Sequence, residues 1–183
     1  MIKTMDMAER DAALRVADLM AAAARTAPKG SGKDKVITLI LTGEDKDKLA
    51  EEMRRAAAEY EEEFIERDSY NVDNSYCVVL IGVKSEPFGL NNCSMCGFEN
   101  CGKMVKAGAN CAFNITDLGI AVGSAVSVAA DHRIDNRVMY SAGRGAVRMG
   151  IFPEDVRVCY GIPLYTGAKS IYFDRDPGSV LVE

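Results

Sequence analysis

Four cysteines lie close together near the middle of the chain, and they constrain its fold more than any other feature. Their spacing is C-x2-C-x4-C-x9-C, over Cys93, Cys96, Cys101 and Cys111. Glycines and asparagines fill the surrounding segment, and both residue types favour tight turns. The pattern predicts one metal site in a cysteine-rich loop over about 88–114, inserted into a single domain that spans 1–183.

Four thiols can hold either zinc or an iron–sulfur cluster. Structural zinc sites usually show two paired C-x2-C steps, whereas here one such pair precedes two single cysteines. This arrangement favours an iron–sulfur cluster of the 4Fe-4S type, although it is not the run found in bacterial ferredoxins. Zinc is the alternative metal, and reactive thiols are a third interpretation.

Two further cysteines lie in apolar, β-branched runs. Cys77 precedes Val78 and Val79, and Cys159 lies between Val158 and Tyr160. A cysteine in such a run behaves as a small hydrophobic residue. We therefore expect both thiols to be buried and inert rather than metal ligands.

The composition excludes several classes of protein. The net charge is -5 and the 22 basic residues are dispersed, so nucleic acid is not an expected partner. With one histidine, a histidine-rich metal site is excluded. The first ten residues are charged and no uninterrupted apolar stretch approaches the roughly 20 residues of a membrane helix. We expect no membrane association and a cytoplasmic location, where thiols stay reduced.

Hydrophobic periodicity predicts alternating helices and strands in one α+β domain, with a mixed sheet between helices. The N-terminal helix should end before Pro28, because the residue before a proline disfavours helix. The expected helices cover about 12–27, 49–64, 116–130 and 143–149, the third capped by Thr116 or Asp117. The expected strands cover 36–41, 77–83, 137–140, 156–160 and 170–173.

The helix from Leu118 to Ala130 is apolar on nearly every side, which predicts that it is covered on every side. Small residues such as Gly119 and Gly123 would let another backbone approach closely. We therefore expect a homodimer organised around this helix, with the core helix of a monomer as the alternative.

Two other features have simpler interpretations. The sequence Gly143-Arg144-Gly145 at a helix start is capable of cradling an anion, but a turn entering a short helix explains it more simply. The histidine, His132, follows the apolar helix, where interaction with the last carbonyl groups is the commonest role.

Most of the chain resembles the uncharacterised microbial proteins that contain a ferredoxin domain. The stretches that carry this resemblance are 91–98 (NNCSMCGF), 117–125 (DLGIAVGSA), 135–141 (DNRVMYS), 161–164 (GIPL), 166–169 (TGAK) and 173–175 (FDR). The family is a domain of unknown function, so the resemblance implies an iron–sulfur protein without naming a reaction.

The order of several landmarks also resembles flavin-dependent nitroreductases. These are the helix ending at 23–28 (AARTAP), the strand after it, the acidic helix opening at 45–49 (DKDKL) and the helix opening at 117–121 (DLGIA). The resemblance implies a mainly antiparallel sheet and dimers that share a cofactor site. It also implies that Lys29, Gly30 and Ser31 lie in a loop that contacts flavin mononucleotide (FMN).

The leading hypothesis is an iron–sulfur electron-transfer protein or oxidoreductase, with or without a linked flavin. A cluster and a flavin together would split electron pairs into single steps. It would exchange electrons with a redox partner protein or a small-molecule acceptor. The rival is a non-enzymatic module in which zinc or a cluster stabilises a partner-binding loop. A redox or metal sensor is a third hypothesis.

Overall fold

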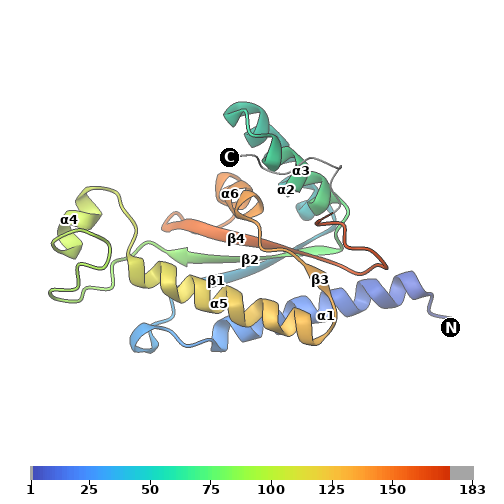
Figure 1. Cartoon of the computed structure of the whole chain (residues 1–183), viewed down its shortest axis with the longest axis horizontal. Coiled ribbons are helices and arrows are strands. Elements are labelled where there is room, and N and C mark those ends of the chain that lie inside the picture. Colours follow the sequence, from blue (N-terminus) through green and yellow to red (C-terminus); the bar gives the residue numbers. More distant parts are fainter. Residues whose placement is uncertain (1, 174–183) are drawn as a thin grey trace.

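A computed structural model describes residues 2–173 and contains a four-stranded sheet between two layers of helices (Figure 1). The strand order is β1-β2-β4-β3, and each of these neighbouring pairs is antiparallel. The strands are β1 (Val36–Thr42), β2 (Cys77–Lys84), β3 (Asp135–Asn136) and β4 (Val156–Tyr165).

Helices cover both faces of the sheet. One face carries α1 (Met5–Thr26) and α5 (Ala112–Asp131), and the other carries α2 (Gly43–Tyr60), α3 (Glu63–Asp73) and α6 (Tyr140–Arg148). The α-helix α4 (Cys101–Lys106) lies apart from both layers, at one end of the molecule (Figure 1). A short 3-10 helix, η1 (Gly30–Gly32), lies between α1 and β1.

The central strand β2 joins two hydrophobic cores. Its alternate side chains point to opposite faces of the sheet. Cys77, Val79 and Ile81 pack against α1 and α5, while Val78 and Leu80 pack in the second core with α2, α3 and α6. A strand buried on both faces needs a continuous apolar sequence, which is what the chain supplies here.

The expected α+β class is confirmed, as are the strands near 36–41, 77–83 and 156–160 and the end of α1 before Pro28. Thr4 caps the start of α1, because its hydroxyl accepts the Met7 N–H at 3.3 Å.

Several expected boundaries were wrong. The helix expected over 49–64 is two helices, because Glu61 adopts a left-handed conformation (φ 57°) between α2 and α3. Helix α5 begins at Ala112, so neither Thr116 nor Asp117 caps it.

The region after α5 also differs from the expectation. Only Asp135–Asn136 pairs as a strand, Met139 forms an isolated bridge to Gly161, and α6 begins at Tyr140 rather than 143. Residues 170–173 form no strand. Short apolar runs fit strand or helix equally well, so their sequence did not distinguish the two.

Among the described helices, α5 is the one long and apolar enough to cross a membrane by length and composition. In the fold it lies along α1 and the sheet, with Leu118, Ala121 and Ala125 buried in the core (Figure 1). Its polar residues Asn114 and Asp117 are buried too. The structure therefore explains its apolar character by its place in the core layer.

Helix α6 packs unusually close to β4 through two glycines. A Cβ atom at Gly143 would lie 1.8 Å from the Cys159 carbonyl oxygen, and one at Gly161 would lie 2.5 Å from the Ala142 side chain. The sequence Gly143-Arg144-Gly145 is thus neither an anion cradle nor a turn, because it lies inside α6 and serves close packing.

Replacing Gly143 by alanine should therefore destabilise the protein, by about 1–3 kcal/mol, because backbone atoms cannot yield as side chains do. Glu51→Ala is the control, since Glu51 is exposed on α2 and alanine is well tolerated in a helix. Urea unfolding of both variants measures the two free energies, and equal effects would contradict this packing.

Candidate metal centre

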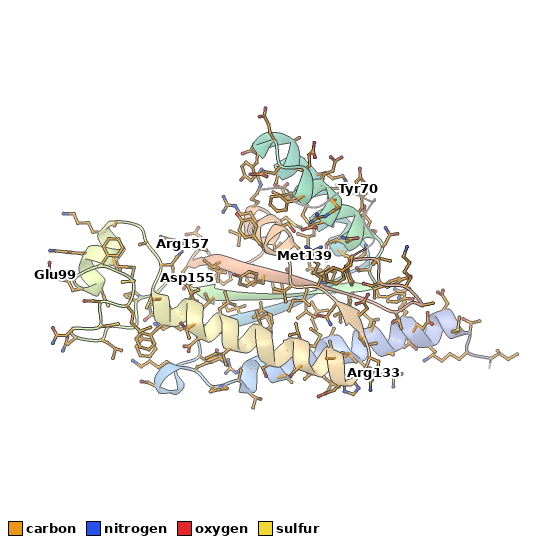
Figure 2. The ribbon with its side chains drawn as sticks, viewed as in Figure 1. Tyr70, Glu99, Arg133, Met139, Asp155 and Arg157 are labelled. Carbon is orange, nitrogen blue, oxygen red and sulfur yellow. The ribbon has the colours of Figure 1, made fainter. Side chains whose placement is uncertain are left out.

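The cysteine-rich segment forms a lobe at the end of the sandwich (Figure 1). We call residues 84–87 the neck and residues 88–110 the lobe. Two hydrogen bonds attach the lobe and the neck to the start of β4. The Arg157 guanidinium donates to the Gly108 carbonyl at 3.1 Å, and the Ser85 N–H donates to the Asp155 carbonyl at 2.7 Å. Figure 2 shows Asp155 and Arg157 near the base of the lobe and Glu99 farther out.

Tight turns position the first two cysteines. Asn92, Ser94 and Gly97 all have left-handed backbone conformations, with φ of 57°, 48° and 81°. The Gly97 N–H donates to the Ser94 carbonyl at 2.9 Å, which closes the turn that contains Cys96. The predicted turn-rich loop is present. Its residues Asn92 and Gly97 adopt left-handed conformations, which asparagine and glycine tolerate better than other residues do.

The other two cysteines lie where helices begin. Cys101 is the first residue of α4, which Asn100 caps by accepting the Lys103 N–H at 3.0 Å. Cys111 is the N-cap residue of α5 and is 6% exposed. The short helix α4 was not expected, because six residues give too little periodicity to recognise, although Asn100 was an available capping signal.

All four cysteines line one hollow. Its other walls are mainly apolar, formed by Phe88, Leu90, Met95, Phe98, Met104 and Phe113. The rings of Phe88 and Phe113 stack with centroids 5.0 Å apart. The hollow is small, about 10 Å³, which is room for one water molecule.

The sulfur atoms share this hollow without forming a site for a single ion. Within residues 2–173, no three histidine, cysteine or acidic side chains are close enough together to hold one metal ion. Tetrahedral zinc would require sulfurs about 2.3 Å from the metal, and hence about 3.8 Å from one another.

The expected flavin loop lies directly against the lobe. A Cβ atom at Gly30 would be 2.7 Å from the ring of Phe88, which itself lines the hollow. The structure thus brings Gly30, in the loop of Lys29, Gly30 and Ser31, against Phe88, a wall of the cysteine-lined hollow.

The Lys29 ammonium and the Gly30 N–H in this loop already make hydrogen bonds within the protein. The Lys29 ammonium donates to the carbonyls of Ala24, Arg25 and Ala27 at 2.7–2.9 Å, which satisfies the end of α1. The Gly30 N–H donates to both oxygens of the Asp117 carboxylate at 3.1 Å. Asp117 is thus a buried acceptor inside α5, not the helix cap that the sequence indicated.

Cys77 and Cys159 are buried in β2 and β4, as expected. Burial in apolar surroundings raises the pKa of both thiols to about 12, because a thiolate is poorly solvated there. His132 lies just past the end of α5, and its backbone N–H donates to the last carbonyls of that helix.

Comparison with known proteins identifies a family and a relative of this chain. The model of the uncharacterised proteins that contain a ferredoxin domain matches residues 107–175. An uncharacterised protein of Archaeoglobus fulgidus is 42% identical over 167 residues, which cover 87% of this chain and 89% of that protein. The chain belongs to this family. The matched segment of the family model contains Cys111 and not the three earlier cysteines.

Solved structures place the family member in the nitroreductase fold. A nitroreductase with bound FMN from Desulfitobacterium hafniense aligns with a TM-score of 0.58 at 12% identity, covering 85% of this chain and 79% of that one. A nitroreductase from Lactococcus lactis in complex with nicotinic acid aligns with a TM-score of 0.56 at 16% identity, covering 93% and 88%. The expected nitroreductase-like fold is confirmed, and identities this low concern the fold alone.

The buried thiols of this family member provide a direct test of the fold. At pH 8 a pKa near 12 leaves about one thiolate in 10,000, so Cys77 and Cys159 should resist iodoacetamide while Cys93, Cys96 and Cys101 react. Mass spectrometry of the metal-free, reduced protein measures each rate, and unfolding in urea should remove the difference. Fast alkylation of Cys77 in the folded protein would contradict its placement in the core.

Proposed function

We propose that this protein is an iron–sulfur electron-transfer protein or oxidoreductase, and that its four clustered cysteines hold a 4Fe-4S cluster. The observation that supports the proposal is the hollow, which four thiols line together with apolar side chains and no other metal-binding group. Membership of a family described by its ferredoxin domain agrees with it.

The spacing of the four sulfur atoms fits a cluster better than a single zinc ion. Thiolates are the usual ligands of iron–sulfur clusters, and a cubane holds its cysteine sulfurs farther apart than one ion does. The described thiols share a hollow without approaching ion-binding spacing. A cluster fills more space than one water molecule. Its uptake therefore requires exposed side chains of the lobe, such as Leu90 and Met95, to move outward.

The residues of the lobe have distinct roles in this proposal. Cys93, Cys96, Cys101 and Cys111 bind the cluster, which supplies one-electron transfer when bound. Phe88, Met104 and Phe113 exclude water from it, and exclusion of water and hydrogen bonds to sulfur set the reduction potential. The donor or acceptor of the electrons is a redox partner protein or a small molecule that reaches the exposed face of the lobe.

The Lys29–Gly30–Ser31 loop does not fit the phosphate of FMN. Its ammonium and the Gly30 N–H are occupied, and the Asp117 carboxylate beside them repels an anion. No step of the proposal therefore uses a flavin. The remaining alternatives, a zinc-stabilised partner-binding module and a redox or metal sensor, share the cysteine site, and all of these functions suit the reducing cytoplasm.

Anaerobic reconstitution with ferrous iron and sulfide tests the proposal. We expect a broad brown absorption shoulder and about four irons and four sulfides per chain. Cys96→Ala and Cys111→Ala should each lower the iron content, because each removes a ligand. Cys159→Ala is the matched control and should retain the full amount, since Cys159 is buried in the sheet.

Other outcomes of the same measurement distinguish the alternatives. A colourless protein with one zinc per chain would support the zinc module and contradict the cluster. Resolved yellow bands in the purified protein would show a flavin despite the occupied loop. Equal iron content in all three cysteine variants would place the iron elsewhere.

We further propose a homodimer that pairs through the outer face of α5. A stripe of Thr116, Gly119, Ile120, Gly123 and Ser127 is exposed along this helix. Cβ atoms at Gly119 and Gly123 would meet nothing within 4 Å, so another backbone has room to approach. The nitroreductase resemblance, which implies dimers, agrees with this arrangement.

Replacing Gly123 by leucine should separate the dimer without harming the subunit. The side chain enters open space within one chain, and leucine favours helix over glycine by almost 1 kcal/mol. Light scattering at micromolar concentration should give twice the 19.8 kDa chain mass for the unmodified protein and the control Ala58→Leu, which lies exposed on α2. It should give 19.8 kDa for Gly123→Leu. A monomeric unmodified protein would refute the dimer.

A further inference from the structure

Two donors from different elements converge on the neck, where the chain leaves β2 and enters the lobe. The Asn114 side-chain amide, in the first turn of α5, donates to the carbonyls of Lys84 at 2.9 Å and Glu86 at 2.6 Å. The Lys35 ammonium, just before β1, donates to the same Glu86 carbonyl at 3.0 Å and to Pro87 at 3.1 Å. The neck is thus fixed from both sides.

Both donors are largely buried, and one atom of Asn114 lacks a hydrogen-bond partner. Asn114 is 2% exposed and its carbonyl oxygen Oδ1 is buried without a hydrogen-bond partner. An unpaired buried acceptor is unfavourable, but the amide nitrogen offsets this cost by donating to two carbonyl groups of the neck. The Lys35 side chain is 11% exposed and its ammonium lies 5.6 Å from the centre of the Phe88 ring.

The neck connects directly to the hollow. Phe88, the first residue after the neck, lines the hollow and stacks on Phe113. Cys111 lies three positions before Asn114, at the N-cap of the same helix. Holding the neck against Asn114 therefore fixes the distance between the aromatic wall and the most buried cysteine.

We propose that Asn114 and Lys35 are positioning residues for the metal centre, an inference that rests on the proposed function. They anchor the base of the hollow, Phe88 and Cys111, while Cys93, Cys96 and Cys101 lie in the turns and short helix of the lobe. The base stays in place when the outer part of the lobe opens to admit a cluster. The Lys35 ammonium also places a positive charge beside the aromatic wall of the hollow, partly offset by the Glu86 carboxylate 3.8 Å away, and a cation there favours the reduced, more negative cluster.

The chain contains a matched control for Lys35. The Lys46 ammonium donates to the carbonyls of Val72 and Asp73 at 3.1 and 2.9 Å and pairs with the neighbouring Asp47. Its side chain is 7% exposed, and it caps α3 in the other helix layer, away from the lobe. Lys46→Met therefore also removes two lysine–carbonyl hydrogen bonds from a similarly buried side chain, but one that does not line the hollow.

The first measurement uses metal-free, reduced protein, so it does not depend on the cluster. We expect iodoacetamide to modify Cys111 about tenfold faster in Asn114→Leu and Lys35→Met, because each loses two hydrogen bonds to the neck. Lys46→Met should leave the rate unchanged, and Cys77 should stay unmodified in all variants. Equal Cys111 rates in Lys35→Met and Lys46→Met would overturn the inference.

The second measurement uses protein reconstituted with iron and sulfide. Loss of the brown absorption to a chelator should be about tenfold faster in Asn114→Leu and Lys35→Met than in Lys46→Met. The reduction potential should fall in Lys35→Met and return in Lys35→Arg, a readout that a purely structural role would not change. If the unmodified protein takes up no iron, the proposed function fails and the Cys111 rates still decide the positioning role. If Asn114→Leu does not fold, Lys35→Met decides both measurements.

Discussion

The two-sided burial of β2 is the constraint on which the rest of the structure depends. Its side chains contribute to the core beneath α1 and α5 and to the core beneath α2, α3 and α6. A one-residue shift of this strand would exchange both sets of side chains, so its register is strongly specified. Since the neck continues directly from β2, the position of the cysteine-lined hollow is set by the same register.

The lobe itself has little to hold it together. Leu90, Met95 and Val105 are exposed, and Met104 is the fully buried apolar side chain of its short helix. A segment with so few buried contacts opens at low cost. Its stability therefore depends on hydrogen bonds to the rest of the protein. These are the bond from Arg157 to the Gly108 carbonyl and the hydrogen bonds at the neck. The cysteine-lined hollow thus has a fixed base and a loosely packed outer part.

The sequence predicted long elements well and junctions poorly. Continuous apolar runs identified β1 and β2, and glycines and asparagines correctly marked the turns around Cys93 and Cys96. The role of Asp117 depends on where α5 begins, and a helix start displaced by about one turn changed it from a cap to a buried acceptor. The contact between Gly30 and Phe88 was not predictable, because it joins segments that meet only once the sheet has formed.

The junction between α1 and β1 shows how a shared fold can lose a family's usual contacts. Lys29 binds three carbonyls at the end of α1, and Asp117 accepts the N–H of Gly30. Both interactions use groups of this chain where the nitroreductase resemblance implies contacts to a flavin. Gly30 then packs against Phe88, so the loop acts as a support for the cysteine-lined hollow. The shared scaffold thus carries different local contacts at this position in this chain, and similarity of fold at 12–16% identity does not by itself transfer a flavin site.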